Sequence, residues 1–273
     1  MPGGRIDVTV SRQSSEPPDA ALWSWVEKAG RAVAAYYGSF PVDRVALTIV
    51  AGGGGGIGEG RTMGEGGQAS IRIAVGADTT AADFSSNWEL VHEMVHLAFP
   101  SMSGHAWIEE GIATYVEPLA RARAGLIPGD EIWRWLLWGL PRGLDGIGSR
   151  GLDGTRSWSA TYWGGALFCF LADDEIRQRT RNQKSLDDAL RGIVKAGGDV
   201  RVSWPIERAL KAGDVAIGVP VLEELYAKMS NSPPKVDLPD LFRRLGVSGG
   251  KDGVVYDDAA PLAAIRKGIT SGR

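Results

Sequence analysis

Two histidines lie four residues apart in the segment His92-Glu93-Met94-Val95-His96, with a glutamate directly after the first. On an α-helix, residues four apart lie one turn above each other on the same face, so the two imidazoles can converge on one cation. Imidazole nitrogen is a preferred zinc ligand, and three protein ligands with an open fourth position are typical of a catalytic zinc site. We therefore predict that His92 and His96 hold a single Zn²⁺ ion.

Glu93 follows the first ligand, about 100° round the helix, so it cannot easily bind the same metal but can reach a water held there. A zinc ion lowers the pKa of its bound water to about 7, and a nearby carboxylate can accept the proton that this water releases. The pattern predicts Glu93 as the general base of a hydrolytic reaction.

A third ligand is expected from a neighbouring helix, and Trp107-Ile108-Glu109-Glu110-Gly111 offers two glutamates shortly downstream. Spacing alone does not separate Glu109 from Glu110. The alternative for the pair of histidines is a hydrogen-bonded position in the core. The chain has only three histidines, so this spacing, together with the downstream glutamates, favours the metal site. The remaining histidine, His105, is expected at the surface or the rim of a cleft.

Three separated stretches resemble the gluzincin peptidases, and more closely the catalytic domain of the glycyl aminopeptidase family. They are HEMVH at 92–96, WIEEGIATYVEPLARARAGLI at 107–127 and ATYWGGALFCFLADDEIRQRTRNQKSLDDAL at 160–190. The second is similar to the family's Trp-x-x-Glu-Gly-x-x-x-Tyr helix, and the third to its Tyr-x-x-Gly helix. Together the matches lie within residues 86–196.

The resemblance implies that Glu110, the glutamate before glycine, is the third zinc ligand and that Tyr162 is the tyrosine that stabilises the transition state. It also implies zinc-dependent hydrolysis of peptide bonds, aminopeptidase-like on peptides, with a peptide or protein as substrate. Two alternatives remain open: a non-catalytic binding module that retains the zincin fold, and a hydrolase of a non-peptide bond.

The chain also departs from this pattern. It has no recognisable counterpart of the N-terminal β-domain or of the PDZ-like domain that relatives carry. The edge-strand motif Gly-x-Met-Glu-Asn of the larger aminopeptidases is missing, and Thr62-Met63-Gly64-Glu65-Gly66 occupies a comparable place. Glu65 can be read as a group that holds a substrate amine, but a solvated loop charge is favoured.

The elements that must position these residues follow from hydropathy patterns. Alternation of polar and apolar residues predicts strands at 5–10, 44–50 and 70–75, and helical spacing predicts a helix from Asp19, as N-cap, to Tyr37. The glycine-rich stretch 52–67 is expected as a loop or bent edge. Further helices are expected at 87–98, with a capping box formed by Ser86 and Glu89, and at 106–124, 130–139, 159–178 and 185–196.

These patterns predict an α+β fold, and the resemblance implies a thermolysin-like zincin catalytic domain. We expect a small N-terminal mixed sheet and a mainly helical C-terminal half. Residues 1–98 would form an α/β subdomain that ends in the helix of His92 and His96. Residues 99–273 would form a helical subdomain that carries the third ligand.

The composition of the chain limits the classes of partner that it could bind. The chain has 273 residues, of which 44% are hydrophobic, enough for a sizeable core, and its formal net charge is -3. This charge balance excludes a whole-chain field that would attract nucleic acid. No segment approaches the 18 or so apolar residues of an integral membrane helix, and the first residues lack an apolar signal core. We expect a soluble protein. Its compartment and oligomeric state stay open, and so does export with the signal peptide absent from this chain.

Overall fold

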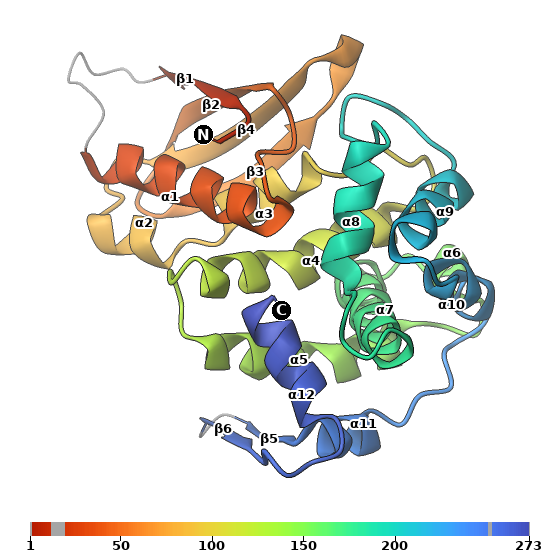
Figure 1. The fold of residues 1–273 in the computed structure, drawn as a ribbon. Helices are drawn as coiled ribbons and strands as arrows, with labels where there is room; N and C mark the ends of the chain where they lie inside the picture. The colour runs from red at the N-terminus through yellow and green to blue at the C-terminus, as the bar shows by residue number, and fades with distance from the viewer. Residues whose placement is uncertain (1, 12–19, 251–252, 273) are drawn as a thin grey trace.

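A four-stranded mixed sheet forms the N-terminal part of the protein (Figure 1). The computed structural model describes residues 2–11, 20–250 and 253–272, apart from the side chain of Glu65. In spatial order the strands are β1 (Arg5–Ser11), β2 (Arg44–Gly52), β4 (Ala69–Gly76) and β3 (Ile57–Met63). β2 pairs in parallel with β1 and β4, whereas β3 pairs antiparallel with β4 at one edge. Helix α1 (Ala20–Tyr37) is the crossover that parallel β1 and β2 require.

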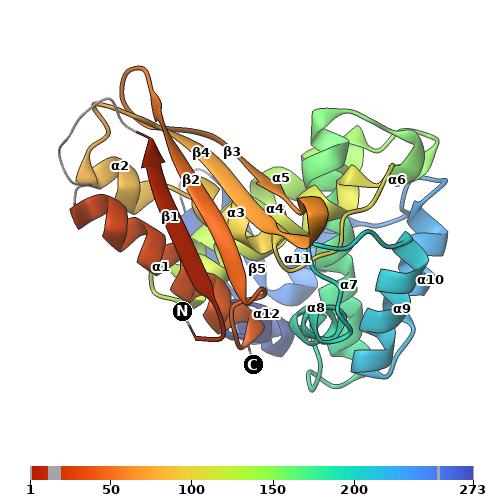
Figure 2. The ribbon, with the colours of Figure 1, turned by 90° about the horizontal axis from the view of Figure 1, so that it is seen from above.

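Apolar residues at alternate positions of the central strands make one face of the sheet the buried one. Leu47 and Ile49 of β2 pair with Ile71 and Ile73 of β4, and all four side chains are buried. Helices lie against this face, as the view in Figure 2 shows. Among them is the helix that carries His92 and His96, which also contacts β3.

Most of the chain after β4 is helical. The elements around the candidate site are α2 (Ala81–Ser86), α3 (Glu89–His96), α4 (Ala106–Arg123), α5 (Gly129–Gly146), the π-helical turn η2 (Ala160–Gly164) and α7 (Gly165–Arg179). The others are η1 (Glu65–Gly67), α6 (Gly151–Gly154), α8 (Leu186–Lys195), α9 (Ile206–Ile217), α10 (Val221–Met229), α11 (Leu238–Leu245), β5 (Val247–Gly250), β6 (Gly253–Tyr256) and α12 (Ala263–Ser271). None of the helices within the described ranges is long and apolar enough to span a membrane.

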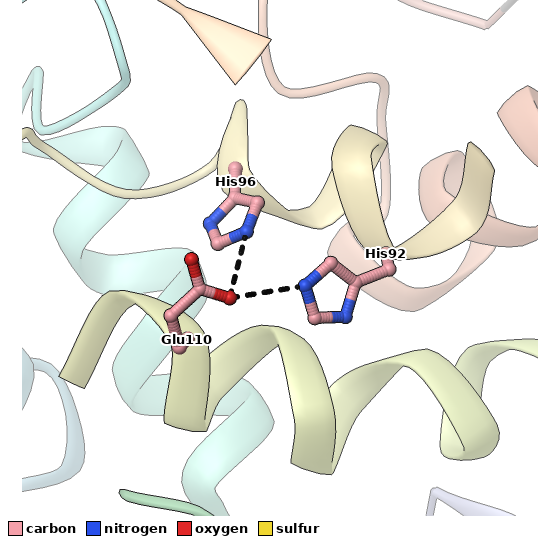
Figure 3. Close-up of side chains that lie close together, drawn as sticks. All are labelled: His92, His96 and Glu110. Carbon is pink, nitrogen blue, oxygen red and sulfur yellow. Dashed lines mark hydrogen bonds and ion pairs between the residues drawn. The ribbon is translucent and has the colours of Figure 1, made fainter. Parts of the chain in front are cut away.

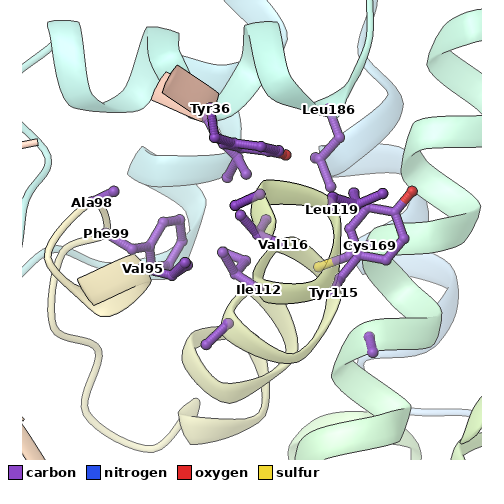
Figure 4. Packing of buried hydrophobic residues seen from close by; sticks show 14 of the residues in the cluster. Tyr36, Val95, Ala98, Phe99, Ile112, Tyr115, Val116, Leu119, Cys169 and Leu186 are labelled. Atoms are coloured by element: carbon purple, nitrogen blue, oxygen red, sulfur yellow. The ribbon is translucent and has the colours of Figure 1, made fainter. Parts of the chain in front are cut away.

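Helix α4 contacts α1 and α3 as well as α5 and α7. Figure 4 shows part of the buried cluster around it. Tyr115, Val116 and Leu119 of this helix are fully buried, and Val95 and Phe99 pack against it from the end of α3. The position of α4 is therefore set by contacts on several sides.

A buried carboxylate also joins α4 to the helices behind it. Asp173 on α7 accepts hydrogen bonds from Arg177 Nε, from the Tyr115 hydroxyl and from the backbone N–H of Leu186, each at 2.9 Å. Buried polar groups are costly unless they are paired, so this network favours one arrangement of the three helices α4, α7 and α8.

The structure confirms the three predicted strands, as β1, β2 and β4, and the mixed fold with a mainly helical remainder. The glycine-rich stretch contains edge strand β3, whose pairing with β4 shifts register between Ile57 and Gly60. The predicted N-cap of the first helix, Asp19, lies outside the described residues.

The predicted capping box of Ser86 and Glu89 is wrong. Ser86 ends the separate helix α2, and its hydroxyl donates to the carbonyl oxygen of Ala82 at 3.1 Å. Trp88 instead takes the N-cap position of α3, without a side-chain hydrogen bond. A capping box forms one helix earlier, between Thr80 and Asp83 at the start of α2.

Candidate metal centre

Helix α3 presents both histidines on one face. The opposite side of this helix is apolar, and Leu90, Met94 and Val95 are fully buried in the core. Burying that side turns His92 and His96 toward α4, where their side chains are only 8% and 14% exposed. The ring centroids of the two histidines lie 5.0 Å apart. Helix α3 therefore presents two imidazole rings to the same side.

Glu110 on α4 completes a cluster of three side chains (Figure 3). Its Oε2 lies 3.2 Å from His92 Nε2 and 3.5 Å from His96 Nε2. The three ligand atoms all lie within 4.8 Å of one another. Tetrahedral zinc with bonds of 2.0 to 2.1 Å separates neighbouring ligand atoms by about 3.3 to 3.4 Å. Two imidazole nitrogens and one carboxylate oxygen at these separations fit a zinc ion.

Charge and burial shift the pKa values of the three groups in different directions. Burial lowers the pKa of the His92 imidazole below its usual 6.5. Burial acts in the same direction on His96, but the hydrogen bond and charge of Glu110 outweigh it, so the pKa of His96 is raised. Burial alone would raise the pKa of Glu110, yet its interactions with the two histidines hold that pKa at about 2. Glu110 is therefore a carboxylate at neutral pH.

The neighbouring glutamate takes a different role. Glu109 Oε1 accepts a hydrogen bond from the backbone N–H of Met102 at 2.9 Å, in the segment between α3 and α4. Successive helix residues point about 100° apart, so only one of two adjacent glutamates can face α3. Spacing left this choice open, and the packing of α4 brings Glu110 rather than Glu109 to the histidines.

Glu93 lies on the side of α3 that faces the edge strand of the sheet. Its side chain is 8% exposed, and its Oε2 lies 2.7 Å from the Thr62 hydroxyl oxygen on β3. Thr62 also lies 2.8 Å from the carbonyl oxygen of Glu93, and its single hydrogen can be donated to one of the two at a time. A Cβ at Gly60 would lie 2.4 Å from Glu93 Cγ, so the strand needs glycine there to pass the carboxylate.

Tyr162 belongs to the π-helical turn η2, a type of turn found frequently at functional sites. Its ring stacks with the His92 ring at a centroid distance of 6.3 Å, so the phenol lies beside the three-residue cluster. Burial, followed by the charges of Glu110 and Glu93, raises the pKa of Tyr162 to about 12. The phenol is therefore protonated and able to donate a hydrogen bond at neutral pH.

Two glycines allow the backbones that carry Glu110 and Tyr162 to touch. A Cβ at Gly111 would lie 2.4 Å from Gly165 Cα, and one at Gly165 would lie 1.9 Å from the carbonyl oxygen of Trp107. The close crossing of α4 with the junction of η2 and α7 thus depends on the absence of side chains. This close crossing fixes the distance between α4 and the start of α7 at a point next to Glu110 in the chain.

Sequence reasoning missed Thr62 and Gly60 as neighbours of Glu93. The available signal was weak, because nothing in the local sequence from Thr62 to Gly66 shows which residue faces α3. His105, expected at the surface or a cleft rim, is half-buried at the start of α4. Its Nε2 lies 3.3 Å from the Tyr226 hydroxyl and 3.6 Å from Asp153 Oδ1. The side chain of Glu65, considered above as an amine-binding group, lies outside the described part of the structure.

Solved structures similar to this chain include an aminopeptidase N family protein and M1 zinc metallopeptidases. An aminopeptidase N family protein from Idiomarina loihiensis matches with a TM-score of 0.63 and 15% identity, over 90% of this chain and 48% of that one. A two-domain M1 zinc metallopeptidase variant bound to L-arginine matches at 0.53 and 15%, over 86% of this chain and 50% of the other. An M1 zinc metallopeptidase variant from Deinococcus radiodurans matches at 0.52 and 16%, with the same coverage.

No protein-family model matches the chain, and neither does any curated protein. At 15 to 16% identity, the solved structures establish similarity of fold. The chain spans about half the length of each of them. It therefore shares the fold of part of these proteins.

Proposed function

We propose that this protein is a zinc-dependent peptidase with aminopeptidase-like action on peptides. One observation carries the proposal: the ligand atoms of His92, His96 and Glu110 meet within 4.8 Å. In this proposal the three side chains hold one zinc ion and leave a fourth position open, as catalytic zinc sites do. The fold shared with zinc metallopeptidases supports the same conclusion.

We also propose the narrower placement implied by the sequence, a gluzincin most similar to the glycyl aminopeptidase family with a thermolysin-like catalytic domain. In this description residues 1–98 form the α/β subdomain and residues 99–273 the helical subdomain. The metal ligands then come from both, with two histidines from the first and Glu110 from the second.

The mechanism assigns one task to each of the remaining polar side chains. A zinc ion at this site would polarise the substrate carbonyl and lower the pKa of a bound water toward about 7. Glu93 accepts a proton from the attacking water and delivers it to the leaving amine, while Thr62 orients its carboxylate. Tyr162 donates a hydrogen bond to the carbonyl oxygen as that oxygen gains negative charge.

The charges near Tyr162 support this assignment. The carboxylates of Glu110 and Glu93 both raise the pKa of the phenol, so the proposed ligand, base and hydrogen-bond donor lie close enough to interact electrostatically. A substrate carbonyl held among them would meet the donor and the base together, as a hydrolytic site requires.

The test is the substitution Glu93→Gln in the zinc-loaded full chain. The amide keeps the size of the side chain but cannot accept the water's proton, so kcat should fall by about three orders of magnitude while zinc content stays at one ion per chain. Glu27→Gln on the exposed face of α1 is the control and should leave both unchanged. Metal analysis and hydrolysis of short peptides with free and blocked amino termini give the two readouts.

Each outcome distinguishes a class of function. Unchanged turnover in Glu93→Gln would refute the mechanism. Tight zinc binding and peptide binding without turnover in the unsubstituted chain would indicate a binding module. Cleavage of blocked and free peptides at equal rates would refute aminopeptidase-like action but retain the peptidase.

A further inference from the structure

An open groove of about 660 Å³ lies between helices α8 and α9, which pack side by side (Figure 1). Within the described ranges, none of the residues that line it belongs to α3, α4 or η2, the elements of the candidate metal centre. A Cβ at Gly192 would lie 2.2 Å from Ala216 Cβ, so the glycine allows the two helices to approach closely. This approach brings side chains of both helices within reach of one ligand.

Positive charge is concentrated on both sides of the groove. Five of the lining side chains are cationic and one is acidic, although the whole chain has a net charge of -3. The cations are Lys184, Arg191 and Lys195 on the side of α8, and Arg208 and Lys211 on α9. The acidic residue, Asp188, lies 3.9 Å from Lys184 Nζ and offsets that charge. In the part of the chain that the structure describes, the other four cations have no carboxylate within ion-pair distance.

Two of these four cations are held in place by neutral partners. Arg191 donates hydrogen bonds to the carbonyl oxygen of Tyr36, from Nε at 2.9 Å and also from Nη2. The guanidinium of Arg208 lies 3.9 Å from the centre of the Trp204 ring. Such contacts restrain a side chain but leave its charge in place. An anionic ligand therefore meets guanidinium groups that are already partly ordered, which lowers the entropic cost of binding.

The other lining residues indicate which class of anion fits. They are small or apolar: Gly192, Ala196, Ala212, Val215 and Ala216. Val215 is 75% exposed, so apolar surface lies beside the cations. A peptide with acidic and apolar side chains would use both kinds of surface, whereas an inorganic anion would use only the charges. Single-stranded nucleic acid normally stacks its bases on aromatic side chains, and none lines the groove among the described residues.

We propose that the groove between α8 and α9 binds an acidic peptide segment of a partner protein. Carboxylates of that segment pair with Arg191 and Lys195 on one side and with Arg208 and Lys211 on the other, and an apolar side chain covers Val215. This inference goes beyond the proposed peptidase function, because the groove contains none of the candidate zinc ligands.

The experiment measures binding of a fluorescein-labelled peptide, in which glutamates flank single leucines, to the full chain by fluorescence anisotropy. A chelator is present, so that zinc-dependent hydrolysis does not contribute. We expect a Kd of about 100 μM or lower at about 50 mM salt, and binding about tenfold weaker at about 300 mM salt. The same peptide with glutamine in place of glutamate should bind at least about tenfold more weakly, because it carries no charge for the cations to pair with.

The double variant Lys195→Glu with Lys211→Glu should weaken binding of the acidic peptide at least about tenfold. Lys28→Glu with Lys228→Glu is the matched control, because it changes the net charge equally at exposed lysines of α1 and α10. Its Kd should stay within about twofold of that of the unsubstituted chain. Circular dichroism checks the fold of each variant, and the milder pair Lys195→Gln with Lys211→Gln should show a smaller loss in the same direction.

Each contrary result has a definite meaning. Equal losses in the two charge-reversal variants would reflect net charge alone and would refute the groove as the binding site. Equal affinity for the glutamate and glutamine peptides would refute recognition of acidic groups. Tighter binding of a single-stranded oligonucleotide of the same charge, lost in the groove variant, would overturn the peptide as the class of ligand. None of these measurements depends on turnover, so this inference and the proposed function can fail separately.

Discussion

Thr62 Oγ1 lies 2.7 Å from Oε2 of Glu93, which links the edge strand of the sheet to the helix that carries the two histidines. The contact joins residues that are 31 positions apart in the chain. One hydroxyl thus restrains the carboxylate proposed as the general base, and the close approach of Gly60 restrains it further.

Thr62→Val should lower kcat about tenfold without loss of zinc. Valine keeps the shape of threonine but removes the hydrogen-bond donor, and one such bond to a charged group is worth about 1.5 kcal/mol or more. Steady-state kinetics and metal analysis check this result. Thr62→Ser keeps the hydroxyl and should retain most of the activity, so equal losses in both variants would count against an orienting role.

Tyr162→Phe should lower kcat roughly a hundredfold with little change in KM, because the lost hydrogen bond forms mainly in the transition state. The pKa of Tyr162 is raised to about 12 by burial and the nearby carboxylates, so its deprotonation should produce no loss of activity below about pH 10. The pH–rate profile of the unsubstituted chain tests this second point. Tyr256→Phe is the control, because that hydroxyl is bonded to Asp130 on a different pair of elements. An effect of Tyr162→Phe on KM alone would exclude the proposed role.

Zinc affinity should fall about tenfold per pH unit as the pH drops near 6.5, which corresponds to release of one proton on binding. The reason is that the pKa of His96 is raised above 6.5, whereas that of His92 is lowered below it. Between these two values only His96 carries a proton that zinc must displace, and Glu110, with a pKa of about 2, is already ionised. Competition with a chelator of known affinity across this range measures the slope. A flat profile, or a hundredfold change per unit at pH 6.5, would be inconsistent with these shifts.

In the zinc-free protein, His96 makes folding stability change with pH in the opposite direction to zinc affinity. The pKa of His96 is raised by folding, so its pairing with Glu110 contributes stability that is fully present below pH 6.5. This contribution is lost as the pH rises through the folded pKa of His96. Thermal unfolding in the presence of a chelator should show this dependence in the unsubstituted chain and much less of it in Glu110→Gln.

Gly111→Ala should lower the free energy of unfolding by about 2 kcal/mol and weaken zinc binding about tenfold. The new Cβ would lie 2.3 Å from the carbonyl carbon of Gly165, so α4 must move away and carry Glu110 with it. Urea denaturation and zinc titration measure the two effects. Gly53→Ala is the control, because no atom lies within 4 Å of a Cβ there, and it should change stability by less than about 0.5 kcal/mol. Loss of stability without loss of zinc affinity would show that Glu110 can follow the shift.

Hydropathy patterns predicted most of the secondary structure because strands and helices are local. Alternating apolar residues in β2 and β4 and helical spacing in α1 and α4 are properties of short segments, and the structure bears them out. Edge strand β3 was not predicted as a strand, because its glycines carry no alternating pattern. This segment is a strand because it pairs with β4, and the local sequence does not encode that contact between two segments.

By itself the sequence determined that the side chains of His92 and His96 share one helix face, because a separation of four residues has this geometry in any α-helix. Spacing did not separate Glu109 from Glu110, and the choice of Glu110 came from the family resemblance. The tertiary structure shows the physical reason that Glu110 faces the histidines, since the rotation of α4 about its axis depends on its packing with α3 and on the close crossing at Gly111 and Gly165. The tertiary structure likewise brought Thr62 to Glu93, and the cations of α8 and α9 to the two sides of one groove. Contacts within a helix follow from its repeat, whereas contacts between elements depend on the balance of packing over the whole core.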